Sequence, residues 1–173
     1  MNNRLFILLV LFCLFTHIIR TIYEILKHKK ILKPDRLSFT VMFLNMVLLW
    51  TSWFVLCRLD KSVIYLPGII SWFGIILVVA GVILFLVALF TIKTLETFKG
   101  DLITYGIYSK IRHPMYLGFL FWSIGSPVFD GALYSFILAI LFSINVLYWR
   151  HLEEIELVNR FPGYISYKAK TIF

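Results

Sequence analysis

The stretch IYLPGIISWFGIILVVAGVILFLVALFTI, residues 64–92, contains no charged side chain and decides the fold class. A helix rises about 1.5 Å per residue, so roughly 20 apolar residues cross the hydrocarbon layer of a bilayer. This stretch is longer than that, which predicts a spanning helix that tilts or projects beyond the bilayer. The composition agrees, because 61% of the 173 residues are hydrophobic and only 15% are charged, against about 25% in soluble domains.

Four more apolar segments flank this stretch, at residues 5–26, 39–57, 115–129 and 131–149. The last two are divided by the turn residues Gly125-Ser126-Pro127 and Asp130-Gly131 and predict a tight hairpin, although the first of these two segments is short for a membrane crossing. We therefore predict an all-α integral membrane protein with about five transmembrane helices and a cytoplasmic C-terminal helical tail. It forms a single membrane domain, with three spans in residues 1–100 and a cofactor-binding and catalytic half in residues 101–173.

Basic residues predict the orientation, because Lys and Arg are enriched in cytoplasmic loops. Thirteen of them fall on one side of the five segments and three on the other, with Arg20 inside the first segment and left out of both counts. This predicts an outside N-terminus and a cytoplasmic C-terminus, and it explains the net charge of +8 without a nucleic-acid partner. The larger group is Lys27, Lys29, Lys30, Lys33, Arg36, Lys93, Lys99, Lys110, Arg112, Arg150, Arg160, Lys168 and Lys170, and the smaller is Arg4, Arg58 and Lys61.

Two further features of the apolar segments are interpreted as structural. Cys13 and Cys57 have no His or Cys at ligand spacing, so we assign them to packing and predict neither a metal site nor a disulfide. The first segment resembles a signal peptide, but His17, Arg20 and residues 27–30 follow where a small-residue cleavage site belongs, and we expect it to be retained. His17 and Arg20 lie near the end of this segment and can reach the interface.

The first polar cluster is Arg112-His113-Pro114-Met115-Tyr116-Leu117-Gly118. Proline fits the first position of a helix, so Pro114 is predicted to start the fourth helix. The unpaired N–H groups that follow, with Arg112 and His113, would form an anion site. Gly118 leaves room for a ligand or a neighbouring helix. The alternative is that Arg112 and His113 are interfacial anchors and Gly118 a packing glycine.

The second cluster, residues 150–167, follows the fifth segment. An antiparallel hairpin places its two open ends together, so this cluster should lie close to the first. Its glutamates could bind a cationic ligand or pair with Arg112; alternatively Arg150 with Glu154, and Glu156 with Arg160, form helical i,i+4 pairs. Its aromatic residues could line a pocket or anchor the chain at the interface. These are Phe161, Tyr164 and Tyr167.

These two clusters resemble the superfamily of membrane-embedded isoprenylcysteine carboxyl methyltransferases and phospholipid methyltransferases. That family carries an RHPxYxG segment, an apolar hairpin and an E-x-x-L-x-x-x-F stretch with spaced tyrosines. The likeness covers about residues 105–170, and Ile107 and Lys110 depart from what many relatives have. The matching positions are Arg112, His113, Pro114, Tyr116, Gly118, Glu154, Leu157, Phe161, Tyr164 and Tyr167.

The resemblance implies S-adenosylmethionine bound between the last two spans and the tail, and a lipidic or prenylated acceptor within the bilayer. Methylation of a carboxylate needs no general base, because the acceptor is already ionised near neutral pH. The resemblance implies catalytic roles for Arg150, Glu154 and Arg112. It places Tyr108, His113, Pro114, Tyr116, Leu117, Gly118, Glu153, Glu154, Phe161 and Tyr164 at the cofactor.

Other functions stay open at this point. An amine-bearing lipid headgroup or a small thiol could be the acceptor. Sterol and steroid reductases share a related His-Pro-Tyr segment and use NADPH, but the short chain argues against them. A noncatalytic membrane protein would leave the two clusters at adjacent helix ends unexplained.

Overall fold

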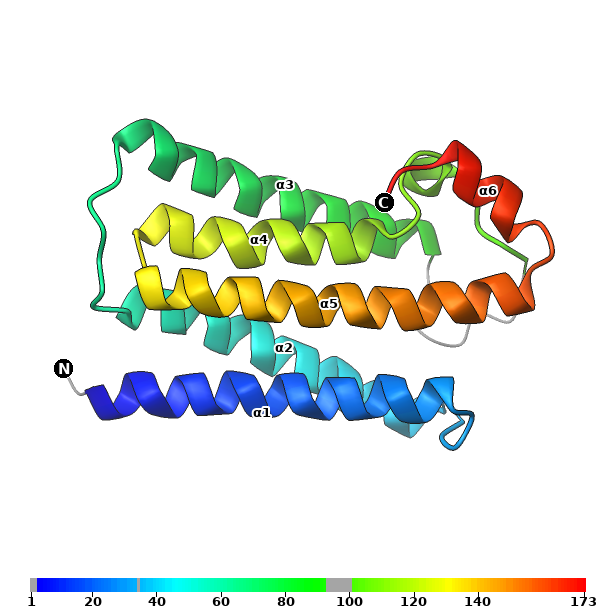
Figure 1. Cartoon of the computed structure of the whole chain (residues 1–173), viewed down its shortest axis with the longest axis horizontal. Coiled ribbons are helices and arrows are strands. Elements are labelled where there is room, and N and C mark those ends of the chain that lie inside the picture. Colours follow the sequence, from blue (N-terminus) through cyan, green and yellow to red (C-terminus); the bar gives the residue numbers. More distant parts are fainter. Residues whose placement is uncertain (1–2, 34, 93–100) are drawn as a thin grey trace.

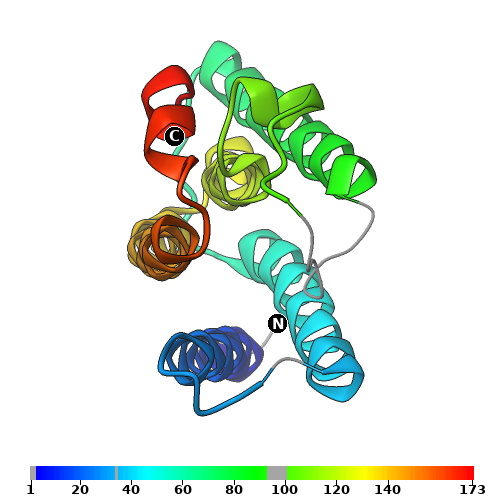
Figure 2. The same ribbon diagram turned by 90° about the vertical axis from the view of Figure 1, so that its right-hand side faces the viewer.

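Long helices that run side by side make up the computed structural model, which describes residues 3–33, 35–92 and 101–173 (Figure 1). An end-on view shows α4 enclosed between α3 and α5, with α1 and α2 covering the other side (Figure 2). The elements are α1 (Asn3–His28), α2 (Arg36–Leu59), α3 (Gly68–Ile92), the short 3-10 helix η1 (Gly106–Ser109), α4 (Pro114–Asp130), α5 (Leu133–Arg160) and α6 (Tyr164–Lys170).

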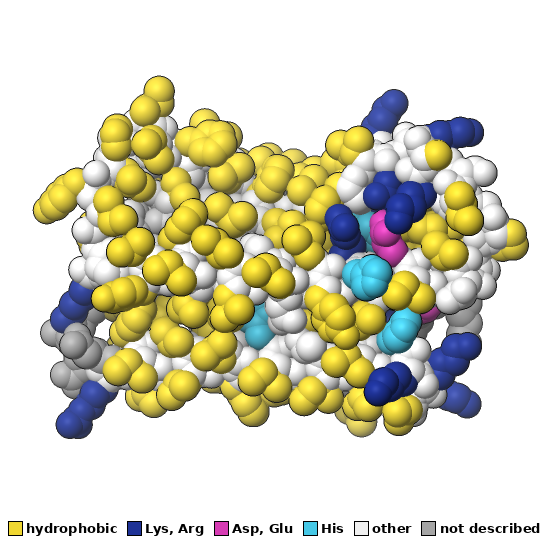
Figure 3. Space-filling model, in the orientation of Figure 1, with side chains coloured by type: hydrophobic (Ala, Val, Ile, Leu, Met, Phe, Trp, Pro, Cys, Tyr) yellow, Lys and Arg dark blue, Asp and Glu magenta, His cyan; other side chains and the backbone are white. Residues whose placement is uncertain are grey.

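Within the described residues, four helices are long and apolar enough to cross a membrane: α1, α2, α3 and α5. Hydrophobic side chains cover the flank of the molecule, while Lys and Arg gather toward its two ends (Figure 3). The all-α membrane fold is therefore confirmed. The fourth predicted span, α4, has 17 residues and lies beside α3 and α5, so the count of five spans stays a prediction. So does the orientation, and two residues of its count, Lys93 and Lys99, lie outside the described residues.

Local sequence signals set several helix ends. Asp35 caps α2 by accepting a hydrogen bond from the backbone N–H of Ser38 at 2.7 Å, in a capping box. Pro114 occupies the first turn of α4, as predicted. Gly131 ends α4 with a positive φ of 65° and opens the two-residue turn of the predicted hairpin.

Two helix boundaries differ from the predicted ones. α3 begins at Gly68 rather than at residue 64, because the residues before it pair with the α4–α5 turn: the Ile64 N–H donates to the Gly131 carbonyl at 2.8 Å. α5 continues to Arg160, well beyond the predicted end at residue 149. The charged residues that ended the apolar segment therefore extend a rigid helix rather than start a separate tail.

Asp60, at the C-terminal end of α2, caps the N-terminus of α5. Its Oδ2 accepts hydrogen bonds from the backbone N–H and the hydroxyl of Ser135 at 2.7 and 2.9 Å. Burial alone would raise the pKa of Asp60, but the hydrogen bonds from Ser62 and Ser135 outweigh it and lower the pKa. This contact ties the α2–α3 connection to the start of the hairpin.

Glycines hold α3 and α4 in close contact. Gly74 and Gly81 of α3 face Gly125 and Gly118 of α4, and a Cβ added to Gly81 would lie 2.5 Å from the Gly118 carbonyl oxygen. A Cβ on Gly118 would meet the Gly81 carbonyl at 2.6 Å. The two backbones thus touch directly, as small-residue interfaces in membranes allow.

Aromatic and aliphatic side chains of α1, α2, α4 and α5 form the core around Trp53, Phe142 and Trp149. Cys13 and Cys57 are buried in this core as unpaired thiols, which confirms their assignment to packing. Cys13 Sγ also lies 3.3 Å from the Ser52 hydroxyl.

Candidate active site

The segment before α4 is fastened by Arg112. Its Nε donates to Glu154 Oε1 at 3.2 Å, and its Nη1 donates to the carbonyls of Lys168 at 3.1 Å and Thr171 at 2.6 Å. One guanidinium therefore joins the start of α4 to α5 and to the chain around α6. Charge-assisted bonds of this kind, with the side chain only 10% exposed, are the stronger class of hydrogen bond.

Glu154 is the centre of this contact. It is buried, receives Arg112 on one oxygen and the Lys168 ammonium on the other at 2.6 Å, and lies 3.4 Å from His113 Nε2. The sequence offered Arg112 or Arg150 as its partner, and the structure selects Arg112. A buried carboxylate needs such partners to remain charged.

His113 lies at the N-cap of α4 and is 4% exposed. Its Nε2 is 3.4 Å from the Tyr164 hydroxyl, and its Nδ1 is 3.9 Å from Glu153 Oε2. Burial lowers the pKa of His113 below its usual 6.5, against the opposing effect of Glu153 and Glu154. The imidazole is therefore neutral near pH 7 and can accept or donate a hydrogen bond.

Residues around α6 close over the segment that precedes α4. The Tyr167 hydroxyl donates to the Tyr108 carbonyl at 2.6 Å, and the Ile172 N–H donates to the Lys110 carbonyl at 2.9 Å. Burial raises the pKa of Tyr108 and of Tyr164, so both remain hydroxyls over the physiological range. The predicted meeting of the two polar clusters is thus present in the structure.

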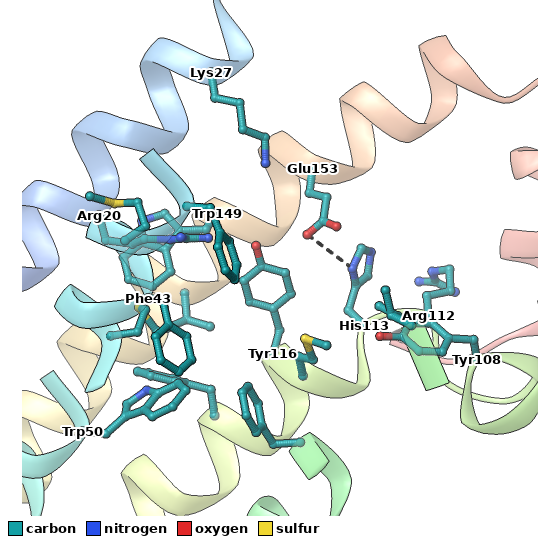
Figure 4. Close-up of a pocket in the computed structure, with 18 residues that line it drawn as sticks. Arg20, Lys27, Phe43, Trp50, Tyr108, Arg112, His113, Tyr116, Trp149 and Glu153 are labelled. Carbon is teal, nitrogen blue, oxygen red and sulfur yellow. Dashed lines mark ion pairs between the residues drawn. The ribbon is translucent and has the colours of Figure 1, made fainter. Parts of the chain in front are cut away.

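A cavity of about 210 Å³ lies between these residues and the helices α1, α2 and α3 (Figure 4). One wall is apolar and comes mainly from α2, whereas the opposite wall is polar and comes from the start of α4 and the last part of α5. Trp149 and Tyr116 stand between the two walls. The apolar wall contains Phe39, Met42, Phe43, Met46, Trp50 and Phe85, and the polar residues are Arg20, Lys27, Tyr108, Arg112, His113 and Glu153.

Two of the polar lining residues, Arg20 and Lys27, come from α1, which the sequence analysis left out of the site. Glu24 lies between them, buried, and forms an ion pair with each. The positions 20, 24 and 27 repeat at helical spacing and so share one face of α1. That spacing is visible in the sequence. It indicates that Arg20 shares a polar helix face with Glu24 and Lys27, which the interpretation of Arg20 as an interfacial residue did not consider.

The residues predicted for the site divide into three groups. Tyr108, Arg112, His113, Tyr116 and Glu153 line the cavity. Pro114, Glu154 and Tyr164 are buried directly behind it.

The third group lies outside the cavity lining. Gly118 packs on Gly81, which is the neighbouring-helix alternative. Arg150 stacks its guanidinium 4.5 Å from the ring centre of Phe173, and Phe161 lies beside Arg160. Leu117 is half-buried in the first turn of α4. The roles of these residues in binding or catalysis remain predictions.

Comparison with known proteins shows the family to which the sequence belongs. The phospholipid methyltransferase family matches residues 69–162. Protein-S-isoprenylcysteine O-methyltransferase B of Arabidopsis thaliana is 35% identical over 106 residues, covering 54% of this chain and 51% of its own length. The rat protein-S-isoprenylcysteine O-methyltransferase is 33% identical over 119 residues, 58% of this chain and 40% of its own.

The protein of the same name from Saccharomyces cerevisiae is 34% identical over 85 residues, covering 46% of this chain and 34% of its own length. The chain thus spans about half or less of the length of these three relatives. No solved structure matches it. Because the matched residues 69–162 make up more than half of the sequence and include α3, α4 and α5 with the polar wall of the cavity, the chain belongs to the phospholipid methyltransferase family.

Proposed function

We propose that this protein transfers a methyl group from S-adenosylmethionine to the carboxylate of an isoprenylcysteine or a similar lipidic acid. The observation that carries the proposal is the two-walled cavity, with Glu153 and His113 on its polar wall and α2 aromatic and methionine side chains on the other. A lipidic acceptor needs the apolar wall, and a charged methyl donor needs the polar one. The names of the relatives support the same reaction.

The residues of the cavity fit the methyl donor chemically. The sulfonium of S-adenosylmethionine is a cation, which a carboxylate and aromatic faces attract. Glu153 supplies the carboxylate, and Tyr108, Tyr116 and Trp149 supply aromatic rings against which an adenine can pack. His113, Tyr116 and Glu153 would therefore hold the cofactor, which supplies an electrophilic methyl group when bound.

The reaction needs positioning more than proton transfer. The acceptor carboxylate forms the new O–C bond while the C–S bond breaks, and the electron pair of that bond goes to sulfur. The products are a neutral methyl ester and a neutral thioether, so no proton moves and no general base is required. Neutralising two opposite charges is favoured in a site with little water, and holding the reactants in line provides much of the rate.

Arg112 and Glu154 serve as positioning residues in this proposal. The two side chains form an ion pair with each other, and each also binds a residue in or next to α6. These contacts hold the start of α4 in place. Sequence similarity suggested a catalytic role for them and for Arg150. Arg150 lies against Phe173 rather than in the cavity lining, so we do not assign it to the acceptor carboxylate.

Calorimetry of the detergent-purified protein with S-adenosylmethionine, S-adenosylhomocysteine and NADPH tests the cofactor. We expect saturable binding of S-adenosylmethionine, weakened about tenfold or more by His113→Ala and by Glu153→Gln, since each removes a charged or hydrogen-bonded contact. Glu154→Ala should weaken it indirectly, by releasing Arg112. His151→Ala, an exposed histidine on the same helix, is the matched control. Binding of NADPH without the adenosyl ligand would contradict the proposal.

A further inference from the structure

Three of the four methionines in the sequence line the cavity. They are Met42 and Met46 of α2 and Met115 of α4, and the fourth is Met1, at the start of the chain. Methionine side chains are unbranched and flexible, so they adapt to apolar ligands of different shapes. The apolar wall of the cavity can therefore follow a bound chain closely without demanding one particular shape.

The face of α2 that lines the cavity sets the length of the apolar wall. Its lining residues begin at Phe39 and end at Trp50, and their helical spacing places them on one face. Trp50 follows Phe39 by eleven residues, which corresponds to a rise of about 16 Å. Trp50 lies on the side of the cavity away from Arg112 and His113 (Figure 4). The wall thus leads from the first turn of α2 to a deep end at Trp50.

Aromatic rings from three helices close this deep end. Trp50 of α2 makes a T-shaped contact with Phe85 of α3, with ring centres 5.0 Å apart, and another with Trp122 of α4 at 5.2 Å. The ring centres of Phe85 and Trp122 are 5.5 Å apart, so each ring contacts the other two. Trp50 and Phe85 line the cavity, and the buried Trp122 lies behind them. We call these three rings the aromatic floor.

The aromatic floor is more rigid than the methionine side chains above it. Aromatic pairs in T-shaped contact stabilise each other beyond the effect of apolar burial, and the three rings come from three different helices. The indole N–H of Trp50 is buried and has no hydrogen-bond partner among the described residues, so the ring contributes its size rather than a polar contact. An adaptable wall above a fixed floor restricts the length of a bound chain more than its shape.

We propose that the aromatic floor limits the length of the apolar chain that the acceptor carries. This rests on the proposed methyl transfer and specifies which lipidic acids the site accepts. An extended chain advances about 1.2 Å per bond, as the peptide backbone does, so three isoprene units span about 14 Å and four about 19 Å. The α2 wall offers about 16 Å. A chain of three units therefore fits, and a fourth unit meets the rings of Trp50 and Phe85.

Binding of acids that differ only in chain length tests the floor. The probes are N-acetylcysteines that carry an S-geranyl, S-farnesyl or S-geranylgeranyl group, which contain two, three and four isoprene units. Tritiated probes are equilibrated with the full-length protein immobilised in detergent. Ratios between variant and wild type cancel the partition of each probe into micelles. Elution as the wild type in size-exclusion chromatography shows that a variant is folded.

Removing part of the floor should admit a longer chain. We expect Trp50→Ala to tighten binding of the geranylgeranyl probe about tenfold, the contribution of roughly two newly buried methylene groups. The two shorter probes should change by no more than about threefold, because their chains do not reach the space that the indole leaves. Phe85→Ala should act in the same direction. Trp72→Ala removes an indole that is 68% exposed on α3 and outside the cavity lining, and it should behave as the wild type.

Raising the floor should have the opposite effect. Met46 precedes Trp50 by one helical turn on the same face of α2, so Met46→Phe places a ring above the floor. We expect this substitution to weaken binding of the farnesyl probe about tenfold and to leave the geranyl probe nearly unchanged. Because Met46→Phe removes no part of the floor, it tests the inference even if Trp50→Ala does not fold.

Two results would overturn the inference. One is a length preference that stays the same in the Trp50, Phe85 and Met46 variants, and the other is the absence of saturable binding of any probe to the wild type. Methyl transfer to the farnesyl probe is measured separately. If transfer occurs but the length preference does not respond to the substitutions, the proposed reaction stands and the floor fails. If the preference shifts as expected but no methyl group is transferred, the floor stands and the proposed reaction fails.

Discussion

The interface between α3 and α4 and the interface between α1 and α5 solve the same problem in opposite ways. Helices in lipid gain little from burying apolar surface, so they associate through close packing or through hydrogen bonds. α3 and α4 bring their backbones together at glycines. α1 and α5 meet through polar side chains: the Trp149 indole donates to the Thr21 hydroxyl at 2.9 Å, and the Asn145 amide lies 3.2 Å from His17 Nδ1.

The difference matches what each interface does for the cavity. The glycine contact fixes α4, which carries His113 at its N-cap and Tyr116 in its first turn. The polar contact fixes the Trp149 ring and brings α1, with Arg20 and Lys27, to the cavity. A direct backbone contact leaves no space for a larger side chain, whereas one hydrogen-bonding side chain can be substituted while the others keep their contacts. We therefore expect substitutions to damage the first interface far more than the second.

The largest effect should come from Gly81→Ala. Its Cβ would lie 2.5 Å from the Gly118 carbonyl oxygen, so α3 and α4 must separate. We expect a loss of about 3 kcal/mol in the free energy of unfolding, at the upper end for overpacked sites. Denaturation by SDS in mixed micelles measures it. Gly163→Ala, where a Cβ would meet nothing within 4 Å, is the control. Equal stability of the two variants would refute the tight contact.

A smaller effect is expected from Thr21→Val, which keeps the shape but removes the acceptor of the Trp149 indole N–H. Single hydrogen bonds between membrane helices contribute about 0.6 kcal/mol on average, so we expect a loss of about 1 kcal/mol, because this hydroxyl accepts hydrogen bonds from both Trp149 and Asn145 of α5. The same micelle titration applies. Thr51→Val, at an exposed threonine that bonds only its own helix, is the control. A loss as large as that of Gly81→Ala would remove the contrast between the interfaces.

The smallest effect concerns pH and the start of α4. Burial holds the pKa of His113 below its usual 6.5 in the folded protein. The unfolded chain therefore binds the proton more readily, so the stability contributed by the neutral imidazole is complete above about pH 6.5 and is lost as the pH falls through the folded pKa. His113→Gln should flatten this part of the stability profile, whereas the exposed His151→Gln should not. If the slope of stability against pH is the same in His113→Gln and His151→Gln, a group other than His113 causes the pH dependence.

Sequence reasoning predicted the features that local signals carry. Pro114 marked the start of α4, and Asp130-Gly131 marked the hairpin turn, whereas Gly125-Ser126-Pro127, also predicted as turn residues, lie inside α4. The hairpin then required the residues before α4 and those after the fifth apolar segment to meet, and the Arg112–Glu154 ion pair confirms this. Such inferences succeed because helix caps and turns depend on a few neighbouring residues.

The rest depends on contacts that are distant in sequence. α5 runs past residue 149 as a continuous helix, and its buried Glu154 meets Arg112 from 42 residues earlier in the chain. The sequence left Gly118 open to a ligand or a helix, because the register that sets it against Gly81 requires both helices. The polar face of α1 was missed for a different reason: the spacing of Arg20, Glu24 and Lys27 is visible in the sequence, but the cavity that Arg20 and Lys27 line is formed only when α2, α4 and α5 are in place.

The contact between α1 and α5 also orders the assembly of the protein in time. Asp60 is synthesised before its partner helix α5, and the glycines of α3 are synthesised before their partner helix α4. In both cases the earlier residue is in place when the later helix is made. Thr21 and Trp149 are 128 residues apart, so this contact cannot form until the last long helix of the described chain is made, although α1 already packs on α2. The pairing of Arg20 and Lys27 with Glu24 lies within α1 and therefore does not depend on α5.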